Sequence, residues 1–142
     1  MTIESFTMEN SFLSNFYPCL IEFEGDIYRT LEHAYQAAKT HDPDERRKIR
    51  EEERAGKAKQ MGKRVTIRED WEQIKVEVMR DLLKKKFENP QLRKLLLDTY
   101  PHDLVEGNNW GDTFWGVCRG HGKNMLGVLL MQLRSELRGE GW

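Results

Sequence analysis

The spacing of apolar and polar residues predicts short strands near the start of the chain. Ile3 to Met8 is expected to form a first strand, and the aromatic, small-polar stretch SFLSNFYP at 11–18 a loop. Leu20–Phe23 and Ile27–Arg29 flank Glu24-Gly25-Asp26, and this arrangement is typical of a β-hairpin. We therefore expect most of the strands to lie within the first thirty residues.

Helix signals dominate the rest of the chain. Thr30 suits an N-cap, and Asp42-Pro43-Asp44-Glu45 places a capping Asp, a Pro and a Glu at the positions that helix starts favour. Apolar residues then recur at helical spacing from Trp71 to Phe87 and again from Met125 to Leu133. The predicted helices are 30–39, 42–53, a further one to Met61 with Gly62 as C-cap, 70–87, 89–97 and 124–137.

The order of elements predicts an α+β fold. Leu104–Glu106 is the one further short strand that we expect, and 124–137 is apolar on most sides, as a central buried helix would be. We expect one compact domain over 1–142, with a small antiparallel sheet packed against a mostly helical layer. A chain of 142 residues is long enough for a real core.

The segment TLEHAYQAAK, at 30–39, is polar where a helix is usually apolar. Glu32, Tyr35, Gln36 and Lys39 share one helical stripe, while Ala34, Ala37 and Ala38 lie opposite. Two interpretations remain open: the stripe lines a polar pocket over an alanine seat, or the helix is an ordinary solvated one.

A second informative segment is EGNNWGDTFWGVCRGHGKN, at 106–124. It has no regular period, and long loops in compact domains are usually functional or disordered; its tryptophans disfavour disorder. Trp110 and Trp115 offer flat surfaces for a base. The amides of Gly116, Gly120 and Gly122, with the start of the last helix, would suit phosphates. The alternative is a structural Ω-loop whose tryptophans fill the core.

Charge and composition exclude several classes of protein. The net charge is -1, with 33% charged residues, so no overall field draws the chain to nucleic acid or membrane. Six basic residues and no acid lie within 54–68, where they could contact phosphates or simply be solvated. Two scattered cysteines and four scattered histidines give neither a disulfide framework nor a metal site, and we expect no cofactor. No signal peptide or spanning segment is visible, so we expect a soluble cytoplasmic protein with no membrane partner.

Five motifs together resemble the NADAR family over nearly the whole chain. They are FLSNFYP at 12–18, YRTLEHAYQAAK at 28–39, KKKFENP at 84–90, LVEGNNWGDTFWGV at 104–117 and GHGKNMLGVLLMQLR at 121–134. The resemblance implies a NADAR-like fold and an N-glycosidase, which hydrolyses the bond between a ribose anomeric carbon and a nitrogen. It also implies either ADP-ribosylated guanine in nucleic acid or phosphorylated ribosyl-pyrimidine intermediates of riboflavin synthesis as substrate.

The resemblance also assigns functional positions. Carried over by motif, they are Glu32, Lys39, Trp71, Asp112 and Trp115, with Asn15, Phe16, Gln36 and Asn124 lining the pocket. Tyr35 and Trp71 are expected to stack on a base or to pack in the core, and His121 is kept as a substrate contact. A paired ADP-ribosyltransferase is a further partner that the family implies.

The residue types fit this chemistry. Cleaving an N-riboside builds positive charge on the ribose, so a carboxylate near the anomeric carbon is required, and Glu32 is the first candidate. Asp112 could share this work or hold a ribose hydroxyl. Lys39 could bind a phosphate or carboxylate, or attack an opened ribose aldehyde if burial depresses its pKa against the effect of Glu32.

One departure from the family bears on the substrate. The spacing between Glu106 and Asp112 is longer than in riboflavin-type members, with Trp110 inserted. This favours ADP-ribose on guanine, as does the basic run at 54–68. The rival hypothesis from another class is a non-catalytic module that binds ADP-ribose or a nucleotide.

Overall fold

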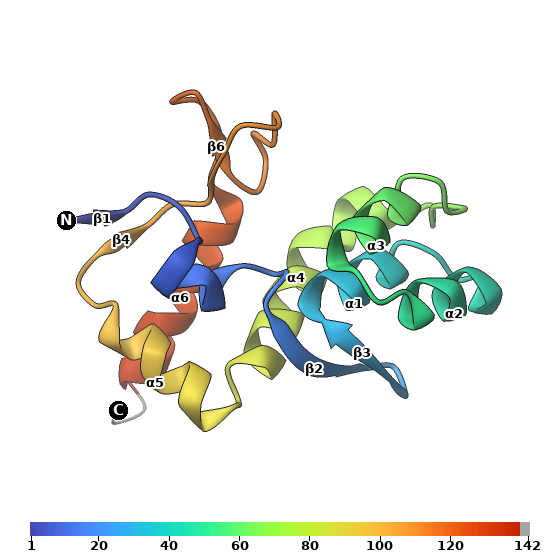
Figure 1. Cartoon of the computed structure of the whole chain (residues 1–142), viewed down its shortest axis with the longest axis horizontal. Helices are drawn as coiled ribbons and strands as arrows, with labels where there is room; N and C mark the ends of the chain where they lie inside the picture. Colours follow the sequence, from blue (N-terminus) through green and yellow to red (C-terminus); the bar gives the residue numbers. More distant parts are fainter. Residues whose placement is uncertain (140–142) are drawn as a thin grey trace. The chain divides into compact units, whose positions relative to one another are not determined.

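The computed structural model describes residues 1–139 and confirms the mixed class of a mostly helical chain with little sheet (Figure 1). Strands and helices alternate in an order close to the one expected. In chain order the elements are β1 Thr2–Ile3, the 3₁₀ helix η1 Met8–Leu13, β2 Pro18–Phe23, β3 Asp26–Thr30, α1 Leu31–Ala38, α2 Pro43–Glu51, α3 Ala55–Gly62, α4 Trp71–Lys86, α5 Pro90–Asp98, β4 Asp103–Leu104, β5 Gly107–Asn108, β6 Val117–Cys118 and α6 Met125–Gly139.

The contacts within the chain group it into two compact units. The first, the hairpin unit, runs from Asn15 to Lys86 and holds β2, β3 and α1 to α4. The second, the loop unit, combines Met1–Ser14 with the chain from Phe87 onward, and holds η1, α5, α6 and the remaining strands. The expectation of a single domain over 1–142 stays a prediction.

The hairpin is the antiparallel sheet that the sequence predicts. Phe23 pairs with Asp26, so Glu24 and Gly25 alone form the turn, with φ of 49° and 92°. Positive φ at both positions is the mark of the tight turn that matches strand twist, and glycine accepts it without strain. The amide of Gly25 donates to Oε2 of Glu22 over 2.8 Å and steadies the turn. Two further strand pairs, β1–β4 and β5–β6, are parallel and two residues long.

Helix α1 is buried on every side. All eight residues from Leu31 to Ala38 are buried, and the helix contacts β2, β3, α2, α3 and α4 (Figure 1). Ala34, Ala37 and Ala38 have no exposed surface, which is how small side chains let neighbouring elements approach closely. The interpretation of this segment as a solvated helix is therefore wrong.

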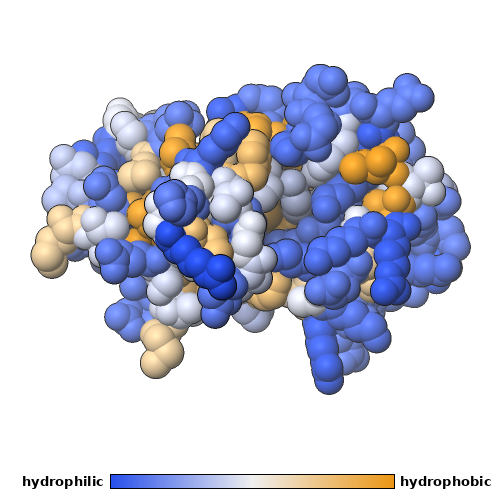
Figure 2. All heavy atoms as spheres, turned by 90° about the horizontal axis from the view of Figure 1, so that it is seen from above, coloured by the Kyte–Doolittle hydropathy of each residue, from blue (hydrophilic) through white to orange (hydrophobic). Residues whose placement is uncertain are grey.

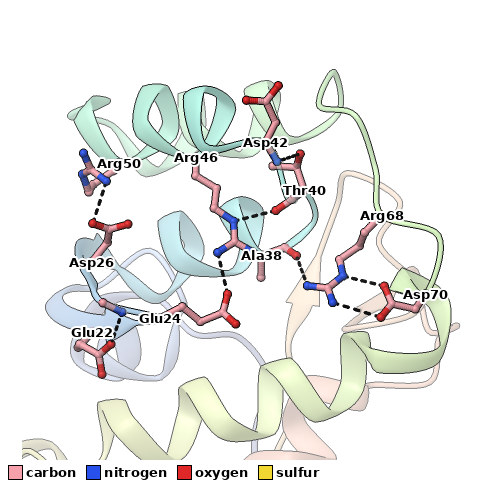
Figure 3. Close-up of polar contacts among 11 residues, drawn as sticks. Glu22, Glu24, Asp26, Ala38, Thr40, Asp42, Arg46, Arg50, Arg68 and Asp70 are labelled. Atoms are coloured by element: carbon pink, nitrogen blue, oxygen red, sulfur yellow. Dashed lines mark hydrogen bonds and ion pairs between the residues drawn. The ribbon is translucent and has the colours of Figure 1, made fainter.

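The carbonyls at the end of α1 are satisfied by two arginines (Figure 3). Arg68 donates its main-chain N–H to Lys39 O over 2.8 Å and Nη1 to Ala38 O over 3.5 Å. Arg46 donates Nε to Thr40 O over 2.7 Å and pairs with Glu24. The last carbonyls of a helix lack intrahelical partners, so a buried helix end needs such donors.

The helix caps at Thr30 and Asp42 lie where the sequence predicts them, but two predicted helix ends are wrong. Thr30 accepts from the amide of His33, and Asp42 caps α2 as expected, but α2 ends at Glu51 rather than Glu53. Gly62 is the last residue of α3 rather than its cap, because Lys63 occupies the C-cap in a right-handed conformation.

The first strand is much shorter than predicted. Only Thr2 and Ile3 pair with β4, whose own extended stretch is Asp103–Leu104 rather than Leu104–Glu106. The chain then leaves the sheet, and Met8, with φ of 54°, begins a 3₁₀ helix. The apolar residues at 3–8 therefore predicted too long a strand, because only two residues of β4 are available to pair with it.

In the loop unit, α6 has one buried apolar face rather than the apolar character on most sides that the sequence predicts, because Gln132, Ser135 and Glu136 are exposed. Leu126, Leu129, Leu130, Leu133 and Leu137 are buried along it. Arg134, also buried, donates Nη1 to Thr99 Oγ1 and to His102 O over 2.9 and 2.8 Å, which ties α6 to the chain after α5.

Hydrophilic side chains cover most of the face drawn in Figure 2, as expected for a chain with 33% charged residues. No helix within residues 1–139 is both long and apolar enough to cross a membrane.

The buried His33 gives the first prediction. Its Nε2 donates to Glu52 O over 2.8 Å, and in the neutral ring Nδ1 accepts from Thr30 Oγ1 over 2.7 Å. Burial lowers the pKa of His33, with the bond to Glu52 O acting the other way. The unfolded chain thus binds the proton more readily.

This stabilisation should be complete above about pH 6.5, the ordinary value for histidine, and should be lost as the pH falls through the lower folded value. The free energy of unfolding in urea should drop as the pH falls below about 6.5, and His33→Gln should flatten that drop. The exposed His41→Gln is the control. An unchanged pH dependence in His33→Gln would contradict the assignment.

Candidate active site

Glu32 lies in a buried polar cluster at the start of α1. Only 6% of Glu32 and 3% of Gln36 is exposed, and Gln36 Nε2 donates to Glu32 Oε2. One turn separates the two residues, which is the spacing at which helix side chains meet. The main-chain amide of Glu32 donates to Asn15 O over 3.0 Å. The predicted stripe is therefore real, and its members touch.

An aromatic pair adjoins this cluster. The rings of Tyr35 and Trp71 lie 5.2 Å apart at 59°, and both residues are at least 95% buried. Lys39 Nζ lies 5.6 Å from the centre of the Tyr35 ring, within cation–π range. The packing interpretation of Tyr35 and Trp71 therefore has direct support, while stacking on a base stays a prediction.

Lys39 is the C-cap residue of α1, and its charge is destabilised. Burial lowers the pKa of Lys39; Glu32 raises it, and Lys59, Lys63 and Lys75 lower it again. The effect of burial on the pKa of Lys39 outweighs that of the Glu32 carboxylate. A lowered pKa is the condition that a nucleophilic lysine requires. Lys59 and Lys63 belong to the basic run at 54–68. Part of that run therefore lowers the pKa of Lys39.

Asn15 and Phe16 precede the hairpin. Asn15 is buried; its Nδ2 donates to Met79 Sδ over 3.6 Å, and its Oδ1 finds no partner in the described structure. Phe16 is 42% exposed and lies beside the start of α3, near Gly56. Asn15, Glu32 and Gln36 are thus joined by hydrogen bonds, and Tyr35, Trp71 and Lys39 by ring contacts.

In the loop unit, Asp112 organises the chain that follows it. Its Oδ1 accepts from the amides of Phe114 and Trp115 over 3.1 and 2.9 Å. Trp115 in turn meets the edge of Phe114 at 4.8 Å between ring centres, whereas Trp110 is 62% exposed. Asp112 and Trp115 are therefore fixed relative to one another.

Asn108 is a central residue of this loop that the sequence did not single out. Its Oδ1 accepts from the amides of Trp110 and Asp112, over 3.3 and 3.0 Å. Its Nδ2 donates to the carbonyls of Glu106, Asp112 and Val117, over 3.4, 2.9 and 3.3 Å. Asparagine in a Gly-rich stretch is the one signal that could have suggested such a turn-forming role.

The first amides of α6 are not free, as binding of a phosphate at the start of the last helix would need, and such binding stays a prediction. Met125 and Leu126 donate their amides to the carbonyls of Phe114 and Trp115, each over 3.0 Å. The side chain of Asn124 donates Nδ2 to Leu104 O and accepts at Oδ1 from the amide of Glu106, each over 2.9 Å. The loop itself supplies the acceptors that an anion would have supplied.

The loop glycines have structural reasons of their own. A methyl group at Gly116 would lie 2.7 Å from Asn108 Nδ2, and one at Gly122 would meet Val117 Cα at 3.0 Å. Gly120, with φ of 80°, forms the turn that closes the bridge between Cys118 and His121. His121 is exposed, and its role as a substrate contact stays a prediction.

Each unit therefore assembles its own share of the predicted residues. Glu32, Lys39 and their neighbours come together in the hairpin unit, and Asp112, Trp115 and the glycines in the loop unit. Within residues 1–139 no group of three or more His, Cys, Asp or Glu side chains could hold a metal ion.

The environment of Lys39 yields a second prediction. Replacing two of the nearby charges in Lys59→Met/Lys63→Met should raise the pKa of Lys39 toward the ordinary lysine value. NMR titration of the Lys39 side chain would measure it. Lys94→Met, whose amine pairs with Asp98, is the control. No change in the double variant would show that these lysines do not act on Lys39.

A third prediction concerns Asn108. Asn108→Ala removes every loop bond made by this half-buried side chain and should cost about 1–3 kcal/mol of stability, because its main-chain partners are left unpaired. Hydrogen exchange of the Asp112 amide should accelerate. The exposed neighbour provides the matched control, Asn109→Ala. Equal exchange in the two variants would contradict the role of Asn108.

Comparison with known proteins identifies relatives of this chain. The NADAR domain matches residues 4–138, which span both units. N-glycosidase YbiA of Escherichia coli is 42% identical over 128 residues, covering 87% of this chain and 79% of that protein. A riboflavin biosynthesis protein of Vibrio vulnificus is 40% identical over 133 residues, and the chain spans only 36% of its length.

Similarity extends to the fold. The NMR structure of the E. coli protein YbiA superposes with a TM-score of 0.86 at 39% identity, covering 99% of this chain and 86% of that one. Family match, sequence identity and fold agree: the chain belongs to the NADAR family.

Proposed function

We propose that this chain is an N-glycosidase that removes ADP-ribose from ADP-ribosylated guanine in nucleic acid. The observation that carries the activity is the buried Glu32 bound by Gln36, with Lys39 one turn further along the same helix, in a chain whose relatives include N-glycosidases. An ADP-ribosyltransferase acting on guanine would supply the substrate.

Glu32 is the group that faces the developing charge. Hydrolysis breaks the bond between C1′ and nitrogen, adds hydroxide from water to C1′ and delivers a proton to the leaving nitrogen. The transition state carries positive charge on the ribose, which an adjacent carboxylate stabilises. Because Glu32 is 94% buried, that attraction acts in a medium of low dielectric constant, where it is strongest.

Lys39 supports the same reaction in one of two ways. As a cation it would hold a phosphate or a carboxylate. As a neutral amine it would attack C1′ of an opened ribose and form a Schiff base while the base nitrogen leaves with a proton; water would then hydrolyse the Schiff base to the free aldehyde. The lowered pKa enlarges the neutral fraction near neutral pH, so it favours the second role. Asp112 would hold a ribose hydroxyl or share the work of Glu32.

Two features support the ADP-ribosyl substrate. Trp110, exposed on the loop that is lengthened before Asp112, presents a flat apolar surface on which a base could stack. Arg54, Lys63 and Arg64 are exposed and could contact nucleic-acid phosphates.

A second candidate has its own support. Riboflavin biosynthesis proteins of Vibrio vulnificus and Zea mays are 40% and 41% identical to this chain. Phosphorylated ribosyl-pyrimidine intermediates are therefore the alternative substrate class, cleaved by the same bond-breaking step.

A panel assay tests the proposal. Purified protein is offered ADP-ribosylated DNA, ADP-ribosylated RNA and phosphorylated ribosyl-pyrimidines, and release of the base or of ADP-ribose is followed. We expect the fastest turnover on an ADP-ribosylated guanine oligonucleotide. Faster turnover of the pyrimidine would replace the substrate assignment and keep the activity.

Glu32→Gln should lower kcat by about 10²- to 10⁴-fold while the fold survives, since it removes the negative charge and keeps the shape. The exposed Glu88→Gln is the matched control and should keep full activity. Full activity in Glu32→Gln would refute this role for Glu32. Calorimetric binding of ADP-ribose by wild-type protein without turnover of any N-riboside would instead identify a non-catalytic reader.

A further inference from the structure

The amide of Gln36 has a defined orientation. Nε2 donates to Glu32 Oε2, whereas Oε1 is buried and has no hydrogen-bond partner among the described residues. Turning the amide over would place Oε1 against the carboxylate, and two acceptors repel each other. The bond to Glu32 therefore determines which way the amide faces. The residue that lies next to Oε1 must leave space for this oxygen.

Gly62, the last residue of α3, leaves that room. A methyl group built on Gly62 would lie 2.6 Å from Cδ and 3.1 Å from Cβ of Gln36, and closer still to Oε1. Real Cβ atoms essentially never approach this closely, so one side must shift. Gln36 is 97% buried on a helix that is itself packed on all sides, so its amide has little freedom to retreat.

Gly56, at the other end of the same helix, provides the contrast. A methyl group there would meet only Phe16 Cε2, at 3.9 Å, which is an ordinary contact. The glycine at 62 is therefore not explained by close packing of α3 in general. It is explained by the one side chain that lies against it.

We propose that Gly62 is a positioning residue for the reaction: by lacking a side chain it lets Gln36 hold the carboxylate of Glu32 in a fixed direction. This inference rests on the proposed function, in which Glu32 faces the reacting ribose. Gln36 thereby gains a role beyond lining a pocket, as the donor that orients Glu32.

The test compares Gly62→Ala with Gly56→Ala. Gly62→Ala should lower kcat by about ten- to a hundredfold, the effect of losing a hydrogen bond to a charged group, with KM little changed. Gly56→Ala should match wild type. Unchanged kcat in Gly62→Ala, or a loss seen mainly in KM, would overturn the proposal.

A double variant separates positioning from folding. In Gln36→Ala the amide that meets the new methyl is gone, so Gln36→Ala/Gly62→Ala should have the same kcat as Gln36→Ala alone. This comparison holds even if Gly62→Ala by itself folds poorly. A further drop in kcat in the double variant would show that Gly62 acts by another route and would refute the proposal.

One readout is independent of turnover. The side-chain NH₂ resonances of Gln36 report its bond to Glu32 and should move in Glu32→Gln and in Gly62→Ala, but not in Gly56→Ala. Unmoved resonances in Gly62→Ala would reject the positioning role whatever the substrate. Failure of the proposed function is distinct, because it appears in wild type and in Glu32→Gln, with residue 62 unchanged.

Discussion

The complete burial of α1 is the constraint on which the hairpin unit depends. A helix enclosed on all sides cannot leave its polar groups to water, so each needs a partner within the protein. Thr30 and His33 satisfy its beginning, and the two arginines satisfy the carbonyls at its end. In between, the carboxylate of Glu32 is kept in a costly environment that a purely structural helix would fill with Leu or Val.

In the loop unit, the polar groups of the glycine-rich loop find their partners within the loop itself rather than on surrounding elements. Its glycine-rich segment turns its polar groups inward, toward its own backbone. Asn108 and Asp112 supply side-chain partners, and the carbonyls of Phe114 and Trp115 receive the first amides of α6. A loop that satisfies itself in this manner needs no ligand to be ordered, so its exposed groups, such as Trp110, can be held in place before anything binds.

Local signals in the sequence predicted most elements of the fold. The hairpin turn, the caps at Thr30 and Asp42, and the start of a helix at Asn89-Pro90 follow from residue types at fixed spacing, and the structure has them. The strand at 3–8 could not be sized, because strand length depends on a partner a hundred residues away.

The site was less accessible from sequence, for a similar reason. The spacing of Glu32, Gln36 and Lys39 predicted one stripe but not its burial, since burial comes from the five other elements packed around α1. Nothing near Gly62 in the sequence connects it with Gln36, and nothing near Lys59 connects it with Lys39. Such pairings arise only when α3 folds back on α1.

The Arg68 amide bonds to Lys39 O, so the segment between these residues leaves α1 and returns to its point of departure. It forms a closed excursion, α2 and α3, which is also held to α1 and the hairpin along its length: Glu52 O accepts from His33, and Arg46 and Arg50 pair with Glu24 and Asp26. Because it also carries Gly62, Lys59 and Lys63, any substitution that shifts α3 would change the surroundings of Glu32 and Lys39 together.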